Sequence, residues 1–378
     1  YVQVIQIGSN GILVGGNFTD QYKTTDVNRL VLLNSNGTLN PNFDIGAGPA
    51  TATVYALAES SDSFFVGGSF SVFDDFKQGK LAKISTIGEL DFGYLTAGVG
   101  FDKAVEKVIP LVDGSYIAFG GFSQFNGKLI NRIAKLTING ELDSSFNFNQ
   151  TGANNTVKEV LVQPDGKLLV AGNFTNYNGV DIKRLVRMNF NGSIDTSLNV
   201  GTGFNYMVYS IVLLPNGEII AAGNFTTYKG VAVNKVIRLL PNGDLDPNFN
   251  IGTNPDGTPN LLVLQPDGKV LVGGDFTTFN GITSNKLIRL NSNGSVDTTF
   301  SVGTGFVGTV YTIMLQNDEK ILIGGSFTSF NGQSNKRIIR LNSNGSQDSS
   351  FNSGTGFSGG TVRSIVVQSN GRILVGGS

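Results

Sequence analysis

The chain has 378 residues, of which 40% are hydrophobic and 15% are charged, and its formal net charge is −1. This balance lacks the basic footprint of a nucleic-acid-binding protein, and no apolar run in the sequence reaches the roughly 18 residues that a membrane-spanning helix needs. The sequence contains neither Cys nor His. The absence of both residue types excludes disulfides, thiolate and imidazole metal sites, and histidine-based acid, base or nucleophile chemistry.

A repeat of about 51 residues organises the whole sequence. One Phe recurs with a Gly two residues before it, at Phe18, Phe70, Phe122, Phe174, Phe225, Phe276 and Phe327, and Gly377 continues the glycine series. This spacing predicts seven complete repeats and the opening of an eighth. Because the chain opens and stops inside repeats, we expect it to be a piece of a longer polypeptide.

The first half of each repeat predicts a β-hairpin. In the sixth repeat, Leu261–Gln265 and Lys269–Gly274 flank the turn Pro266-Asp267-Gly268, in which Pro presets the backbone and Gly takes the left-handed position. The nearly continuous apolar strands predict burial on both faces. The glycines at the strand end predict a close backbone approach, and the following Phe is expected to fill space between neighbouring units.

The second half predicts another hairpin, with strands Leu287–Asn291 and Ser295–Phe300 around a Ser-Asn-Gly turn. This register places Arg289 opposite Asp297. The same spacing pairs Lys83 with Asp91, Lys135 with Asp143, Arg187 with Asp195, Arg238 with Asp246, and Arg340 with Asp348. The first repeat has Leu32 and Asn40 at these positions, so it lacks both partners together. We interpret the pairs as structural contacts of about 0.2–1 kcal/mol each that help to set the register.

Four strands per unit, repeated radially, are typical of a β-propeller, and we predict one such domain over residues 1–378. A β-solenoid is the alternative, although its repeats are usually shorter and lack two hairpins. First hairpins start near Tyr1, Val54, Ala104, Val157, Val208, Asn260, Val310 and Val362, whereas only seven second hairpins follow. An unpaired apolar hairpin would expose strand edges, so we favour a ring of eight blades over a ring of seven.

The run VLQPDGKVLVGGDFTTFNGITSNKLIRLNSNGSVDTTF, residues 263–300, resembles the delta-60 repeat. That β-propeller family occurs in long bacterial surface or secreted proteins and in some phage proteins. The resemblance spans Tyr1 to Ser378 and is weakest in the second repeat, where Asp74, Asp75 and Phe76 replace the Phe-Asn-Gly turn. It implies the fold and an extracellular, cell-surface or phage-virion location, and it supplies no catalytic or ligand motif.

Two recurrent patterns are candidate binding sites. The run from Asn291 to Asp297 superficially resembles a calcium loop, but its early positions are amides, and a tight turn explains the same residues. An aromatic residue precedes each loop tip, at Phe73, Phe125, Tyr177, Tyr228, Phe279 and Phe330. These rings could form one sugar-stacking platform per blade, although we favour the interpretation that each anchors its turn.

Acidic residues outside the repeat pattern occur at Asp74-Asp75 and in the cluster Asp102, Lys103, Glu106 and Lys107. Propeller glycosidases act through carboxylate pairs, so these residues are the candidates for catalysis, although such clusters more often mark solvated loops.

We therefore predict a non-catalytic scaffold, without cofactor or metal, that binds a protein or glycan through loops on one face. Asp74, Asp75 and Phe76 are the predicted contact residues, because the second repeat departs from the common pattern there. A part in a larger assembly is compatible with this prediction, whereas nucleic acid and a membrane span are not expected. The alternative is a carboxylate-based glycosidase or lyase at the axial mouth of the propeller.

Overall fold

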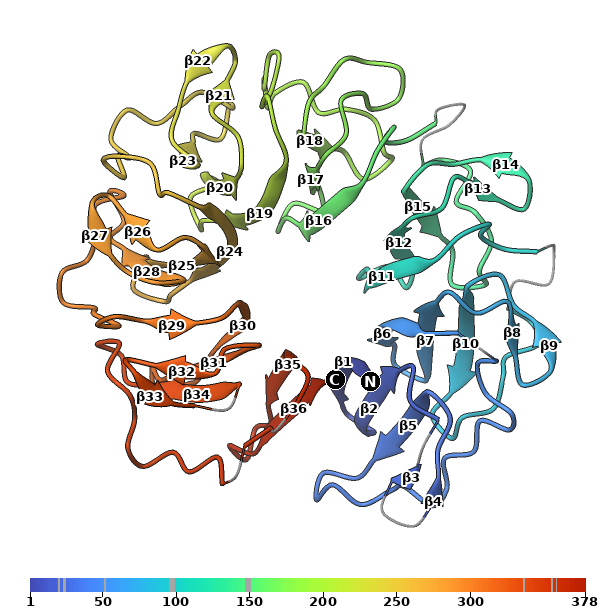
Figure 1. Ribbon diagram of the computed structural model, residues 1–378. Helices are drawn as coiled ribbons and strands as arrows, with labels where there is room; N and C mark the ends of the chain where they lie inside the picture. Colours follow the sequence, from blue (N-terminus) through green and yellow to red (C-terminus); the bar gives the residue numbers. More distant parts are fainter. Residues whose placement is uncertain are drawn as a thin grey trace. The chain divides into compact units, whose positions relative to one another are not determined.

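The structure is a computed structural model that describes residues 1–19, 21–22, 25–50, 52–94, 99–146, 151–335, 337–354, 356–357 and 359–378. Over these residues the chain contains 36 strands and no helix, which confirms the all-β prediction (Figure 1). The chain divides into two compact units. One comprises residues 1–156 together with 368–378, and the other comprises residues 157–367.

In the described residues, each of the seven complete repeats forms one three-stranded antiparallel sheet with its first, second and third strands in that order. The first strands are β1 (Val2–Gly8), β6 (Val54–Glu59), β11 (Val105–Pro110), β16 (Val157–Val162), β19 (Val208–Leu213), β24 (Thr258–Leu264), β30 (Val310–Leu315) and, in the eighth repeat, β35 (Val362–Val367). The second strands are β2 (Gly11–Gly16), β7 (Ser63–Gly68), β12 (Tyr116–Gly120), β17 (Leu168–Gly172), β20 (Ile219–Gly223), β25 (Val270–Asp275), β31 (Ile321–Gly325) and β36 (Ile373–Gly377). The third strands are β5 (Leu30–Leu33), β10 (Leu81–Ser85), β15 (Ile133–Leu136), β18 (Leu185–Met188), β23 (Val236–Leu239), β28 (Leu287–Leu290) and β34 (Ile338–Leu341).

The first hairpin has the predicted turn. Gly268 adopts φ = 80°, and the amide of Gln265 donates to the Lys269 carbonyl across the turn at 2.8 Å. The second strand β25 is buried from Val270 to Gly274, whereas the first strand β24 is only partly buried. Burial on both faces is therefore confirmed for the second strand alone, because the second strand lies between two neighbours while the first lies at the sheet edge.

The predicted second hairpin is shorter than expected. Its strand β28 is present, but the returning segment touches it through a single bridge, Leu290 to Val296, and each of the other complete repeats has one such bridge in the described residues. The cause is local, because Oδ1 of Asp297 accepts a hydrogen bond from the Thr299 amide at 3.0 Å and turns the chain away. The blades thus have three regular strands and a one-residue fourth contact.

In six of the seven complete repeats the segment between the second and third strands forms a small hairpin that we predicted only as a loop tip, and in the fourth repeat a single bridge joins Tyr177 to Val180. These hairpins pair β3 (Gln21–Tyr22) with β4 (Thr25–Asp26), β8 (Val72–Phe73) with β9 (Phe76–Lys77), β13 (Gln124–Phe125) with β14 (Lys128–Leu129), β21 (Thr227–Tyr228) with β22 (Val231–Ala232), β26 (Thr278–Phe279) with β27 (Ile282–Thr283), and β32 (Ser329–Phe330) with β33 (Gln333–Ser334). In the seventh repeat β29 (Phe306–Val307) adds a strand beside β32.

The glycine two residues before the recurrent Phe lies against a backbone carbonyl in six repeats, at Gly16, Gly68, Gly120, Gly223, Gly274 and Gly325. A Cβ at Gly223 would lie 2.2 Å from the Met207 oxygen, and a Cβ at Gly274 would lie 2.3 Å from the Thr258 oxygen. The Phe two residues later is fully buried in the second to seventh repeats. Both predictions about this motif are therefore confirmed, and the glycine is needed because no side chain fits beside the carbonyl.

Within each unit, the buried side chains of one repeat join those of the next in a shared core. In the first unit, Leu30 of β5 belongs to the cluster that contains Phe70 and Phe73 of the second repeat. In the second unit, Leu287 of β28 belongs to the cluster of Phe327 and Phe330. The third strand of a repeat therefore covers the aromatic residues of the repeat that follows.

We expect the substitution Gly223→Ala to lower the free energy of unfolding by about 1–3 kcal/mol, the usual cost of overpacking, because the new methyl group would collide with the Met207 carbonyl. Chemical denaturation followed by circular dichroism measures the change. Gly359→Ala is the matched control, since a Cβ at Gly359 has no atom within 4 Å. Equal stability of the two variants would contradict the close-approach interpretation.

Candidate functional site

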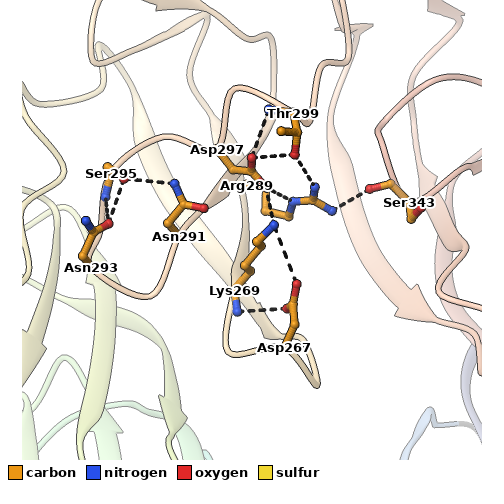
Figure 2. Close-up of polar contacts among 9 residues, drawn as sticks. All are labelled: Asp267, Lys269, Arg289, Asn291, Asn293, Ser295, Asp297, Thr299 and Ser343. Atoms are coloured by element: carbon orange, nitrogen blue, oxygen red, sulfur yellow. Dashed lines mark hydrogen bonds and ion pairs between the residues drawn. The ribbon is translucent and has the colours of Figure 1, made fainter.

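The most extensive polar cluster in the sixth repeat surrounds Asp297 (Figure 2). Nε of Arg289 donates to Oδ2 of Asp297 at 2.8 Å, and both side chains are buried. Lys269, which follows the first turn, reaches the same oxygen at 3.0 Å. Oδ1 of Asp297 accepts hydrogen bonds from the hydroxyl and the amide of Thr299. Both carboxylate oxygens are thus occupied by donors from the same repeat.

All six predicted cross-strand ion pairs are present. Besides Arg289 with Asp297, the structure joins Lys83 to Asp91, Lys135 to Asp143, Arg187 to Asp195, Arg238 to Asp246, and Arg340 to Asp348. The sequence reasoning missed the second cation, which recurs as Lys167 beside Asp195 and Lys320 beside Asp348. In the fifth repeat Glu218 replaces this lysine and instead binds Arg238 at 3.2 Å.

The arginine of this cluster also reaches the following repeat. Nη1 of Arg289 donates to the Ser343 carbonyl at 2.5 Å, as Figure 2 shows, and Nη1 of Arg238 donates to the Ser292 carbonyl at 2.6 Å. Each accepting carbonyl belongs to the outer turn of the next repeat. The ion pair therefore fixes two sheets at once, and its role is structural.

Hydrogen bonding lowers the pKa of the central carboxyl group. Burial by itself raises the pKa of Asp297, but donation from Thr299, Lys269 and Arg289 outweighs burial and holds the pKa well below the usual 3.8. The pKa of Asp195 is lowered in the same way by Lys167, Ser197 and Arg187, against the opposing effect of burial. These groups stay ionised at neutral pH and are poor proton donors.

The geometry of the Asn291–Asp297 run is that of a turn. Oδ1 of Asn293 accepts from the amide and the hydroxyl of Ser295, and the Asn291 amide group donates to the same hydroxyl at 3.0 Å. The described residues contain no group of three or more His, Cys, Asp or Glu side chains that could hold a metal ion. The turn interpretation accounts for every residue in the run.

The recurrent aromatic residues at the loop tips are buried, with exposed fractions of 0–3% at Phe73, Phe125, Tyr177, Tyr228, Phe279 and Phe330. The hydroxyl of Tyr228 also donates to the Gly243 carbonyl at 2.7 Å. These rings cannot stack on a sugar in the folded chain. The anchor interpretation is confirmed and the platform interpretation is wrong.

The structure changes the alignment of the second repeat. Phe73 pairs with Phe76, just as Phe125 pairs with Lys128, so Phe73-Asp74-Asp75 occupies the Phe-Asn-Gly turn and Phe76 follows it. Asp74 takes the role of the turn Asn. Its Oδ1 accepts from the Ala47 amide at 2.9 Å, as Oδ1 of Asn126 accepts from the Gly100 amide at 2.7 Å. Asp74 is thus tied to the fold, whereas Asp75 and Phe76 are exposed.

Phe76 contacts a second exposed aromatic residue that sequence reasoning missed. Phe76 is 49% exposed, Phe92 is 60% exposed, and their rings meet edge to face with centroids 4.7 Å apart. At the Phe92 position the other complete repeats have Pro41, Ser144, Thr196, Pro247, Thr298 and Ser349. At the Phe76 position they have Thr25, Lys128, Val180, Val231, Ile282 and Gln333. The second repeat alone is aromatic at both positions, and the two departures come together on its surface.

One member of the predicted acidic cluster, Asp102, stabilises the fold through hydrogen bonds. Asp102 accepts hydrogen bonds from the amides of Ser123 and Gln124 at 2.8 and 2.9 Å and from the Ser123 hydroxyl at 2.7 Å. Burial raises the pKa of Asp102, but these bonds outweigh it and lower the pKa overall. Glu106 and Lys107 are exposed on β11. The hydrogen bonds of Asp102 thus tie its carboxylate to the Ser123–Gln124 segment.

The sequence reasoning also missed a basic residue that immediately precedes the third strand of each complete repeat, at Arg29, Lys80, Arg132, Arg184, Lys235, Lys286 and Arg337. Several of these side chains hold carbonyls of the linking segments. Nη1 of Arg184 donates to the Phe204 carbonyl at 3.2 Å, and Nζ of Lys235 donates to the Gly257 carbonyl at 2.7 Å. Their recurrence at intervals of 51 or 52 residues could have revealed these basic residues from the sequence.

A cavity of about 590 Å³ lies over the third strand of the first repeat, with Asp26, Asn28, Asn40 and Asp44 among its polar walls. The corresponding cavity of the fifth repeat measures about 270 Å³, and there the Arg238 guanidinium lies over the Phe249 ring. The extra space in the first repeat follows from Leu32 and Asn40, which replace the arginine and its aspartate.

Repeated three-stranded sheets, joined by shared cores and interblade arginines, define a repeat scaffold of the β-propeller class. A family model described as a domain of unknown function (DUF5122) beta-propeller matches residues 9–43, 113–146, 163–198, 214–249, 265–300 and 316–351, more than half of the chain. The chain belongs to this family. The matched ranges omit the second repeat, in line with the weaker resemblance predicted there.

Similar solved structures share the fold at low sequence identity. The computationally designed Ika8 protein is 10% identical, with a TM-score of 0.55, over 85% of this chain and 80% of that chain. The protein YCF48, solved bound to D1 peptide, is 10% identical, with a TM-score of 0.50, over 87% of this chain and 92% of that chain. No curated protein matches the chain. No helix long and apolar enough to cross a membrane occurs in the described residues.

We expect Arg289→Leu to lower the free energy of unfolding by about 1.5–3 kcal/mol, because Asp297 and the Ser343 carbonyl both lose a charged donor. The double variant Arg289→Leu/Asp297→Asn, which copies the first repeat, should lose less than the sum of the two single substitutions. Urea denaturation of the four proteins measures the coupling. Strict additivity would show that the pair is not energetically linked.

The lowered pKa values of Asp195, Asp297 and Asp348 predict acid sensitivity. A carboxyl whose pKa is lower in the folded chain stabilises the fold above its unfolded value, 3.8, and loses that contribution as the pH falls further. The free energy of unfolding of the native protein should therefore fall steeply below a pH of about 4. The substitution Asp297→Asn should make this dependence of stability on pH less steep. Denaturation midpoints at several pH values test this, with the exposed Asp62→Asn as the control. The prediction would be contradicted if the stability of Asp297→Asn depended on pH as steeply as that of the native protein.

Proposed function

We propose that the chain is a non-catalytic interaction module, which binds a protein or glycan partner through loops of one face. The exposed Phe76–Phe92 pair of the second repeat carries this proposal. Exposed aromatic residues are strong contact residues, because they bury a large apolar area with little loss of side-chain entropy. The two rings meet edge to face at an interplanar angle of 82°, so they do not form one flat platform of the kind on which a sugar stacks.

The state of the carboxyl groups supports a non-catalytic role. Each carboxyl pKa shift that is resolved in the described residues is downward, as at Asp102, Asp256 and Asp297. A glycosidase or lyase at the axial mouth, the alternative function, needs a carboxyl group whose pKa is raised so that it can donate a proton. No observation in the described part of the chain favours that alternative.

We further propose that residues 1–378 form one domain with eight blade positions, of which the eighth is represented by its first and second strands. Two packing contacts support this count. In the unit of residues 157–367, β35 packs against β30, and in the other unit β36 packs against β1. Each strand of the eighth repeat thus meets a first strand, as expected for a further blade.

The delta-60 resemblance supports an extracellular, cell-surface or phage-virion location, and a part in a larger assembly is compatible with it. A peptide partner is compatible with this fold, since the similar protein YCF48 was solved bound to D1 peptide. Labelling of intact cells or particles with a membrane-impermeant reagent tests the location. Protection of the chain from the label would contradict it.

The test of the binding proposal grafts residues of the third repeat onto the second. Phe76→Lys/Phe92→Ser installs the residues found at Lys128 and Ser144. Partners are first identified with the native chain on glycan arrays and by crosslinking at the native surface, and affinities are then measured by biolayer interferometry. We expect the double variant to lose at least about tenfold in affinity, or about 1.4 kcal/mol, with an unchanged melting temperature.

The matched control is Phe190→Ser, which removes another exposed Phe and installs the serine that Ser292 and Ser343 provide in other repeats. It should leave the affinity unchanged. Equal affinity of the native chain and the double variant would refute the site. Turnover of a glycoside or ester that one carboxylate substitution abolishes would refute the non-catalytic role.

A further inference from the structure

The ion cluster of the second repeat lacks one of the cations that the regular repeats possess. In the sixth repeat, Nζ of Lys269 reaches Oδ2 of Asp297 at 3.0 Å, beside Arg289 (Figure 2). The registers of β7 with β10 and of β25 with β28 place Ser63 of the second repeat at the position of Lys269. A serine thus stands where the fourth, sixth and seventh repeats have a lysine.

The aspartate of the second repeat is correspondingly less enclosed. The side chain of Asp91 is 38% exposed, whereas that of Asp297 is 4% exposed. Nζ of Lys83 contacts Oδ2 of Asp91 at 3.2 Å, and the Gly93 amide donates to Oδ1 at 2.9 Å. The hydroxyl that binds Asp297 has no counterpart, because Gly93 takes the place of Thr299. Among the described residues, Asp91 therefore has one cation and one amide donor where Asp297 has two cations, an amide and a hydroxyl.

A cavity of about 290 Å³ lies beside Asp91, and its walls include Asp62, Ser63, Lys83 and Glu89. The walls thus hold three carboxylates against a single ammonium group. Asp62 and Glu89 are exposed. Because carboxylates that converge on a concave surface attract positive charge, the cavity favours a cation.

The regular repeats show which cation fits beside this aspartate. An ammonium group approaches the equivalent carboxylate oxygen at 2.9 Å from Lys167, at 3.0 Å from Lys269 and at 3.1 Å from Lys320. All three lysines stand at the position that Ser63 has in the second repeat. The cavity beside Asp91 is therefore the place of a lysine ammonium that the second repeat does not supply, and we call it the ammonium slot.

The third repeat also lacks this lysine, but its cluster closes without it. Ser115 stands at the lysine position there, and Lys135 contacts both Asp113 at 3.5 Å and Asp143 at 3.2 Å. The side chain of Asp143 is 19% exposed, half the 38% of Asp91. Of the six paired aspartates, Asp91 is therefore the most open to a further cation.

The ammonium slot adjoins the exposed aromatic pair. Phe92 follows Asp91 directly in the chain, so their Cα atoms lie about 3.8 Å apart, and the Phe92 ring contacts Phe76. A partner that docks here meets a cavity rich in carboxylates and two exposed rings within the span of two neighbouring side chains. The combination matches a segment that offers positive charge next to apolar surface.

We propose that the partner is a protein segment in which a lysine lies beside an apolar side chain. The lysine ammonium enters the ammonium slot and binds Asp91, as Lys269 binds Asp297 in the sixth repeat. The apolar side chain packs on Phe76 and Phe92. This partner class rests on the interaction role proposed above, and it narrows a protein or glycan partner to a basic protein segment.

The probe is a labelled peptide with acetylated and amidated ends and the central sequence Leu-Lys-Leu, so that apolar residues flank the lysine on both sides. The control peptide has glutamine in place of lysine. Fluorescence anisotropy at low ionic strength should show that the native chain binds the lysine peptide at least about fivefold more tightly than the control peptide. Equal affinities, or no saturable binding of the lysine peptide, would overturn the proposal.

Variants of the chain test the slot itself. Ser63→Lys supplies the ammonium from within and should lose the preference for the lysine peptide without a lower melting temperature. Asp91→Asn should lose the same preference, and the fold accommodates asparagine at this position, as Asn40 shows in the first repeat. Ser115→Lys is the matched control and should keep the preference, because Lys135 already closes the cluster of the third repeat. If Ser63→Lys fails to fold, Asp91→Asn decides, and an unchanged preference in the deciding variant refutes the slot.

The native partner separates this inference from the proposed binding role. If Phe76→Lys/Phe92→Ser loses the partner while Ser63→Lys and Asp91→Asn bind it as the native chain does, the aromatic pair is a binding site and the ammonium slot is refuted. If the slot variants lose at least about fivefold in affinity while the aromatic variant does not, the slot stands and the aromatic contact fails. Tighter binding of a glucosamine oligomer than of the lysine peptide would assign the slot to an amino sugar and overturn the proposal.

Discussion

The fold depends on one repeated contact, in which the third strand of a repeat covers the aromatic residues of the next. Each sheet is too small to bury its own apolar faces, so its stability comes from its neighbours. A glycine one residue before the end of the second strand allows the close packing of neighbouring repeats, because a Cβ at Gly15 would lie only 2.5 Å from Cγ1 of Val54 in the next repeat. Where the contact is complete, Phe276 and Phe279 are fully buried, and where it is incomplete, Phe18 is not.

The recurrent ion pairs depend on the same contact. Arg289 can reach both Asp297 of its own repeat and the Ser343 carbonyl of the next only because the two sheets are already packed together. Its charge is then largely removed from water and satisfied by several acceptors, which is the condition for a buried pair to be tolerated. The first repeat, with Leu32 and Asn40, shows that the array can omit the pair when both partners are lost together.

In such a uniform scaffold, the function that we propose rests on departures from the repeat. The recurrent aromatic rings of the second to seventh repeats are buried in the core, and most recurrent carboxylates are bound in ion pairs. Phe76 and Phe92 are different, because no repeat rule requires an aromatic residue at either position and both remain exposed.

The sequence by itself determined the period, the hairpin turns and the six cross-strand pairs, because these depend on residues a few positions apart and on local backbone preferences. It could not decide whether Tyr177 and Tyr228 are buried anchors or exposed platforms, since both interpretations place an aromatic residue before a turn. The sequence also could not show that the fourth strand is short, because a hydrogen bond to the side chain of Asp297 overrides the strand pattern. Only the tertiary structure brought Phe76 to Phe92 and left Phe18 half-covered, because burial depends on which distant segments pack together.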